Sequence, residues 1–188
     1  ALVAKQAMSV AYLTGNRLAL GVGTSPWPED YDIMGVDFAR RGKRMDECMD
    51  IIRGLQTGEY FEFHGEFYDI PKIKMNPAPT APIPLLVGGH ADLALRRAVR
   101  RGDGWMHGGG PQEELDTLLD KIAALRTAEG KDAQAMIDHA KANLREGHGN
   151  VTLPSEFKLT VADEIKWIKE HREKRDWLTI VAEVEGKL

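Results

Sequence analysis

Apolar and polar positions alternate along the chain in two rhythms that predict strands followed by helices. Short continuous apolar runs that end near glycine predict buried strands over residues 17–23, 83–87 and 104–106. Apolar residues spaced three and four apart predict helices over residues 39–55, 90–101 and 113–128, and a weaker pattern predicts one over 133–146. Strand and helix in this alternation imply right-handed crossovers and a parallel sheet.

The segments between these elements carry turn signals. Residues 1–12 predict the end of a helix, and residues 24–38, with two prolines and a glycine, predict a loop. Aromatic and polar residues alternate over 60–70 and predict a short hairpin. Towards the C-terminus a capping pattern predicts a helix over 160–174, followed by a strand over 177–184 that is centred on 178–181. In the helix predicted over 90–101 we expect Leu93, Ala94, Ala98 and Val99 to face inward.

The composition favours a globular protein and argues against several other classes of protein. The 188 residues are 43% hydrophobic and 29% charged, which is ordinary for a soluble globular domain. A net charge of -4 argues against a nucleic-acid partner, and no apolar run is long enough to cross a membrane. The single cysteine, Cys48, excludes an internal disulfide and suits a reducing cytoplasm. The six histidines show no metal-ligand spacing, so we expect no metal site.

The junction of the second strand with its helix is the sharpest candidate site. Gly88 and Gly89 would let a phosphate approach the backbone, and the helix that we expect to begin at His90 would offer free N–H groups to that anion. A tight turn without a ligand explains the two glycines equally well, and both interpretations stay open.

A second glycine-rich strand end lies at Gly23, followed by Thr24 and Ser25. Glycine and small hydroxyl residues there would allow a planar ring to lie against the backbone, although a plain turn with a local hydroxyl hydrogen bond also fits. No sequence pattern assigns a catalytic residue. His107 ends a predicted strand, but we interpret it as structural or solvent-exposed.

One more group of charged residues lies on the helix predicted over 39–55. Arg40, Arg41, Arg44 and Glu47 are spaced to share a face, and we interpret them as a solvated charged surface.

Several short motifs, in this order and spacing, resemble the luciferase-like monooxygenase superfamily. They cover residues 13–23, 35–38 with 40–47, 63–68, the proline-rich run into 87–89, and 95–98 with 102–105. The match extends to about residue 131 and fades over 132–188. Within the superfamily the sequence is most similar to the branch that depends on the deazaflavin coenzyme F420.

The resemblance implies an α/β fold of the (β/α)8 TIM-barrel type, with residues 1–188 forming one partial barrel domain whose N-terminal strands lie outside this sequence. It also implies an oxidoreductase that transfers a hydride through bound coenzyme F420, with the cofactor phosphate near Gly88 and Gly89. The alternatives are an FMN-dependent monooxygenase and a flavin-binding barrel or fragment without activity. A small-molecule substrate, a homodimer and a cytoplasmic location are further expectations. Where some deazaflavin dehydrogenases carry a catalytic glutamate, this chain has Ser25 and Pro26, which argues against sugar-phosphate dehydrogenase chemistry.

Overall fold

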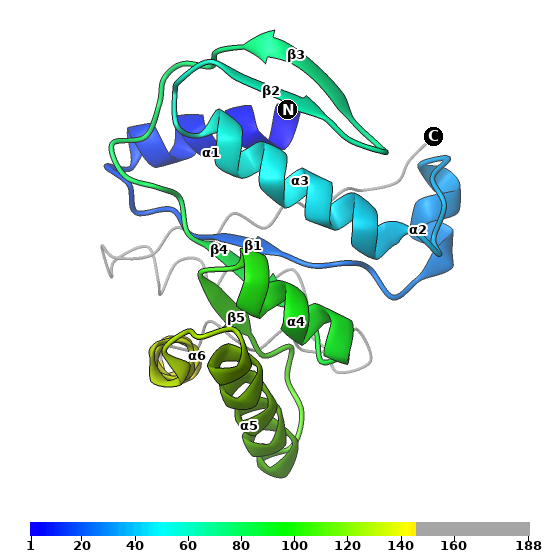
Figure 1. The fold of residues 1–188 in the computed structure, drawn as a ribbon, viewed down its shortest axis with the longest axis vertical. Coiled ribbons are helices and arrows are strands. Elements are labelled where there is room, and N and C mark those ends of the chain that lie inside the picture. The colour runs from blue at the N-terminus through cyan, green and yellow to red at the C-terminus, as the bar shows by residue number, and fades with distance from the viewer. Residues whose placement is uncertain (146–188) are drawn as a thin grey trace, which may run out of the picture. The chain divides into compact units, whose positions relative to one another are not determined.

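The computed structural model describes residues 1–145 of the 188 (Figure 1). The elements, in chain order, are α1 (Leu2–Leu13), β1 (Leu20–Val22), α2 (Pro28–Ile33), α3 (Arg41–Leu55), β2 (Phe61–His64), β3 (Asp69–Ile73), β4 (Leu85–Gly88), α4 (Asp92–Arg101), β5 (Gly104–Met106), α5 (Gln112–Ala128) and α6 (Ala133–Arg145). The helix and strand predicted over 160–174 and 177–184 lie outside the described residues.

Strands β1, β4 and β5 form a parallel sheet in the order β1-β4-β5. Leu20 pairs with Leu85 and Val22 with Val87, so the parallel arrangement predicted for the first two strands is confirmed. Strand β1 is shorter than predicted and is only partly buried, because it forms an edge of the sheet within the described residues. Within the described residues these three strands form an open sheet of the α/β class, and β2 and β3 form a separate two-stranded sheet.

The main core lies between the sheet and the helices α3, α4 and α5. Leu85, Val87 and Trp105 point from alternate strand positions into this core and are almost fully buried. Helix α4 meets them with Leu95, Ala98 and Val99. The expectation that Leu93 faces inward is wrong: its side chain is 74% exposed, because the buried stripe of the helix runs through Leu95 at the spacing of three and four residues.

The hairpin of β2 and β3 is confirmed and is held on α3 by one carboxylate. Glu47 accepts hydrogen bonds from the backbone N–H groups of Glu66 (2.7 Å), Phe67 (2.9 Å) and Tyr68 (3.1 Å). The guanidinium groups of Arg40 and Arg44 lie over the Phe67 ring, each 4.7 Å from its centre. These side chains therefore anchor the hairpin, and the interpretation of this helix face as merely solvated is wrong.

Two further differences from the predictions concern helices α2 and α4. The loop predicted over 24–38 contains α2, which begins at Pro28 with Glu29 and Asp30 in its first turn, a favourable start for a helix. Helix α4 begins at Asp92 instead of at His90, because Ala91 is in an extended conformation. Within residues 1–145 no helix is long and apolar enough to cross a membrane, and no three acidic, histidine or cysteine side chains are placed to hold a metal ion.

The contacts of Glu47 generate a prediction about stability. Glu47→Ala leaves three hairpin N–H groups without their acceptor, two of them partly buried, and we expect the free energy of unfolding to fall by about 2 kcal/mol. Chemical denaturation measures the change. Asp120→Ala, which removes an exposed helical carboxylate from α5, is the matched control and should have little effect. Equal stability of the two variants would show that the hairpin is held mainly by its aromatic contacts.

Candidate functional site

The C-terminal ends of β1 and β4 bring the two predicted glycine motifs together. Because the strands are parallel and in register, Gly23 follows Val22 beside the point where Gly88 ends β4. A Cβ atom built on Gly23 would lie 4.0 Å from the Gly88 carbonyl oxygen, and one built on Gly88 would lie 3.8 Å from that of Val22. The two backbones therefore form a surface without side chains at this edge of the sheet.

Gly89 shapes the turn that leaves this edge. Its φ angle of +118° lies in a region that L-amino acids rarely adopt, and an added Cβ would approach that of Ala94 to 3.0 Å. The backbone N–H groups of the first α4 turn, at Asp92 and Leu93, have no acceptor within the helix. The Asp92 carboxylate pairs with Lys121 of α5 at 3.1 Å. Gly89 thus permits a close backbone approach that any larger residue would obstruct.

His90 connects the end of β4 to the end of β5. Its ring stacks on that of His107 with centroids 4.7 Å apart, and the Gly108 backbone N–H donates to its Nε2 at 3.2 Å. Nε2 is thereby the acceptor nitrogen, so the proton lies on Nδ1, which donates to Glu114 Oε1 at 3.2 Å. Both ring nitrogens are occupied by these contacts, which leaves the backbone and the ring edge of His90 to meet a ligand.

His107 is buried beneath this arrangement, with an exposed fraction of 5%, so the suggestion that it is solvent-exposed is wrong. Burial, with a further contribution from His90, lowers its pKa below the ordinary value, which keeps the imidazole neutral near pH 7. Its Nε2 has no hydrogen-bond partner among residues 1–145. The sequence held a signal for this placement: the two-residue repeat of a strand puts His107 on the same side as the buried Trp105.

Thr24 and Ser25 follow Gly23 but differ in their surroundings. The Ser25 hydroxyl interacts with the Asp30 carboxylate and accepts a hydrogen bond from the Trp27 backbone N–H at 3.2 Å. These contacts form a local turn. A turn of this kind was one of the two interpretations of the hydroxyl residues from the sequence. Thr24 is half-buried and lies at the rim of a hollow between α3 and α4.

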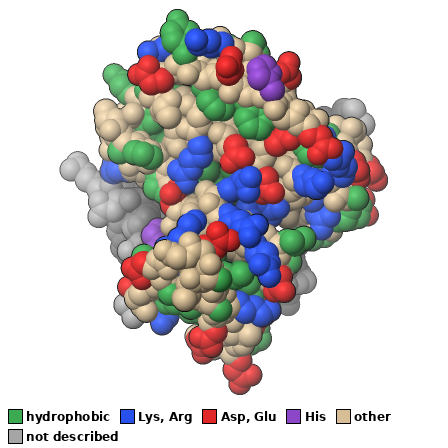
Figure 2. Space-filling view, viewed as in Figure 1, with side chains coloured by type: hydrophobic (Ala, Val, Ile, Leu, Met, Phe, Trp, Pro, Cys, Tyr) green, Lys and Arg blue, Asp and Glu red, His purple; other side chains and the backbone are tan. Residues whose placement is uncertain are grey.

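This hollow, which the sequence analysis did not anticipate, has a volume of about 470 Å³ and a strongly basic lining. Among the described residues a single carboxylate, Asp46, lines the hollow, and it is surrounded by the cationic side chains of Arg41, Lys43, Arg96, Arg97, Arg100 and Arg101. Figure 2 shows Lys and Arg side chains gathered where α3 faces α4. We refer to this feature as the basic hollow. The spacing of the arginine pairs 96–97 and 100–101, four residues apart on a helix, was the available signal.

The geometry suits a ligand with a flat ring and an anionic group. The glycine surface at Gly23 and Gly88 admits a ring or a phosphate close to the backbone, where a Cβ would fill the space. The free N–H groups at the start of α4 favour negative charge. A buried neutral imidazole nearby has a nitrogen available for one more hydrogen bond.

Two of the proteins that resemble this chain in sequence show the range of its relatives. An uncharacterized protein of Mycobacterium tuberculosis, Rv0940c, is 72% identical over 131 residues, which are 70% of this chain and 45% of that protein. The F420-dependent glucose-6-phosphate dehydrogenase of Amycolatopsis mediterranei is 28% identical over 158 residues, 76% of this chain and 47% of the enzyme. The chain thus spans less than half the length of these relatives.

Solved structures share the fold. A riboflavin lyase crystallised with modified FMN and riboflavin superimposes with a TM-score of 0.64 at 17% identity, covering 72% of this chain and 36% of the lyase. The family model described as luciferase-like monooxygenase matches residues 1–146, more than three quarters of the sequence. This chain's relatives in sequence include both F420-dependent and FMNH2-dependent proteins. The chain belongs to the luciferase-like monooxygenase family.

Proposed function

We propose that this protein is an oxidoreductase that transfers a hydride by means of bound coenzyme F420. The observation that carries the proposal is the side-chain-free edge formed by Gly23 and Gly88, continued by Gly89 in a left-handed conformation. The dehydrogenase of Amycolatopsis mediterranei, a relative over most of this chain, carries F420 dependence in its name. The deazaflavin supplies the hydride chemistry, and the protein supplies binding and orientation.

The proposed cofactor contacts are Gly23, Thr24, Ser25, Gly88, Gly89 and His90. Gly23 and Gly88 would lie against the cofactor, and Gly89 would let its phosphate reach the N–H groups that begin α4. Thr24 has a hydroxyl at the rim of the basic hollow, whereas Ser25 and His90 would act through the backbone because their side chains are engaged elsewhere. His107 would offer its free Nε2 to a polar atom of the ligand.

We further propose that residues 1–188 are part of one (β/α)8 barrel domain. Three parallel strands, each joined to the next through helices, match three neighbouring units of such a barrel. The glycine edge then lies at the C-terminal face, where barrel enzymes place their active sites. A small-molecule substrate would approach from that face.

The alternative within the same family is an FMN-dependent monooxygenase. The riboflavin lyase of similar fold was crystallised with modified FMN, and the glycine edge would admit either ring system. We favour the deazaflavin because the basic hollow beside Thr24 offers positive charge beyond what one phosphate requires. Ser25 and Pro26 stand in place of a catalytic glutamate, so we propose no sugar-phosphate substrate.

Absorption of the purified protein tests the choice of cofactor. After incubation with coenzyme F420 or FMN and gel filtration, we expect the deazaflavin band to co-elute with the protein and the flavin band to be largely removed. Retention of FMN with loss of F420 would establish the alternative. A protein that retains neither cofactor would contradict cofactor binding by this chain altogether.

Gly89→Val tests the phosphate site. The branched side chain should weaken binding of coenzyme F420 at least about tenfold, because it meets Ala94 and strains a backbone with φ +118°. Gly130→Val is the matched control, since Gly130 also has a positive φ but faces open space far along the chain. Fluorescence titration gives the affinities, and circular dichroism establishes that each variant is folded. Unchanged affinity in folded Gly89→Val would show that the glycine pair is only a turn.

A further inference from the structure

We propose that the basic hollow between α3 and α4 binds the anionic oligoglutamate tail of coenzyme F420. This inference rests on the proposed function, which takes the charge of the hollow as an argument for the deazaflavin but assigns no part of the cofactor to the hollow. The hollow begins at Thr24 and Ala91, which adjoin the glycine edge, and continues between the two helices. If the cofactor phosphate binds at the glycine edge, the chain of carboxylates attached to it would enter the basic hollow.

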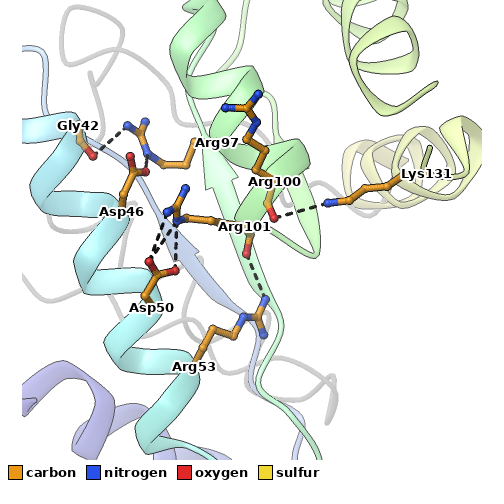
Figure 3. A network of polar contacts seen from close by, with 8 residues as sticks. All are labelled: Gly42, Asp46, Asp50, Arg53, Arg97, Arg100, Arg101 and Lys131. Carbon is orange, nitrogen blue, oxygen red and sulfur yellow. Dashed lines mark hydrogen bonds and ion pairs between the residues drawn. The ribbon is translucent and has the colours of Figure 1, made fainter. Parts of the chain in front are cut away.

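Two arginines of the hollow build its wall. Arg97 projects from α4 to α3, where it donates to Asp46 at 2.6 Å and to the Gly42 carbonyl at 3.0 Å, and its side chain is only 10% exposed (Figure 3). Arg101 pairs with Asp50 at 3.1 Å. These ion pairs fix the distance between α3 and α4. The two walls of the hollow are therefore held in place by contacts between the helices.

Some of the other cationic side chains of the hollow are not paired with a carboxylate and can attract an anionic ligand. Among the described residues neither Lys43 nor Arg96 forms an ion pair, and both side chains are exposed. Arg41 lies over the Phe38 ring at 3.8 Å and donates to the Phe38 carbonyl, which leaves its positive charge without a carboxylate. Arg100 pairs with Glu129, whose pKa it lowers. Asp46, Asp50 and Glu129 thus neutralise three of the six cations.

A ligand that matches this unneutralised positive charge must carry several negative charges in a row. An oligoglutamate tail has one carboxylate per residue, whereas FMN ends at a single phosphate. The volume of about 470 Å³ is within the range of small-ligand sites, so part of such a tail fits. Lys43 lies in the first turn of α3, where the positive end of the helix dipole adds to its attraction for carboxylates. Arg96 lies at the middle of α4 and acts through its own charge.

The experiment compares two forms of the cofactor, one with the full tail and one truncated after the phosphate, by fluorescence titration at about 0.15 M salt. Wild-type protein should bind the tailed form about fivefold more tightly or better, as expected for two added ion pairs. Lys43→Glu with Arg96→Glu should abolish that difference and leave the affinity for the truncated form nearly unchanged. Lys72→Glu with Lys141→Glu makes the same change in charge at exposed positions outside the hollow and should retain the difference.

The remaining outcomes separate this inference from the proposed function. Equal binding of the two forms by wild-type protein would overturn the tail site and leave cofactor binding intact. Failure to bind either form would overturn the proposed function itself. A calorimetric titration with inorganic pyrophosphate identifies a separate ligand: binding that Lys43→Glu with Arg96→Glu removes, without any effect of tail length, would assign the hollow to a free anion and overturn the tail.

Discussion

The parallel register of β1 against β4 is the constraint on which the rest of the site depends. Pairing of Val22 with Val87 places the next residue of each strand, Gly23 and Gly88, at the same edge. A shift by one residue would turn the buried Leu85 and Val87 to the other face of the sheet and would separate the two glycines. The core and the ligand surface are therefore specified by the same hydrogen-bonded pairing, and neither can change alone.

Ion pairs between α3 and α4, the helices that follow β1 and β4 in the chain, help to stabilise the pairing of these strands. Arg97 is nearly buried, and a guanidinium removed from water in this way is costly unless it is paired, as it is with Asp46 and the Gly42 carbonyl. Arg53 of α3 donates to the carbonyl group of Arg101 (Figure 3). It also contacts the Asp103 carboxylate and the Ile83 carbonyl. Asp103 in turn accepts from the Leu85 backbone N–H at 2.7 Å. The start of β4 and the turn before β5 are thus tied to one helix.

Much of the fold could be predicted from the sequence because strand and helix periodicities are local signals. The parallel strands, the hairpin and the glycine pair at the end of β4 follow from apolar spacing and from glycine positions. Leu93 was misplaced because, at 3.6 residues per turn, it lies on the same side of α4 as the four arginines and opposite the buried stripe of Leu95, Ala98 and Val99. The role of Glu47 depends on N–H groups some 20 residues away, and local pattern carries no information about such a contact.

The candidate site likewise contains features that local sequence patterns predict and features that depend on contacts between distant segments. Its glycines could be found from the sequence, since they follow apolar runs, but the stacking of His90 on His107 and the basic hollow arise only when separate segments meet. The arginines of α4, to which the sequence assigned no role, line a cavity because α3 supplies Arg41 and Lys43 opposite them. The same juxtaposition is what the proposal uses to choose between the two cofactors. The glycine edge would accept either ring system, whereas the hollow would favour a ligand with negative charge beyond one phosphate, so the proposal of the deazaflavin depends more on the hollow between the helices than on the edge.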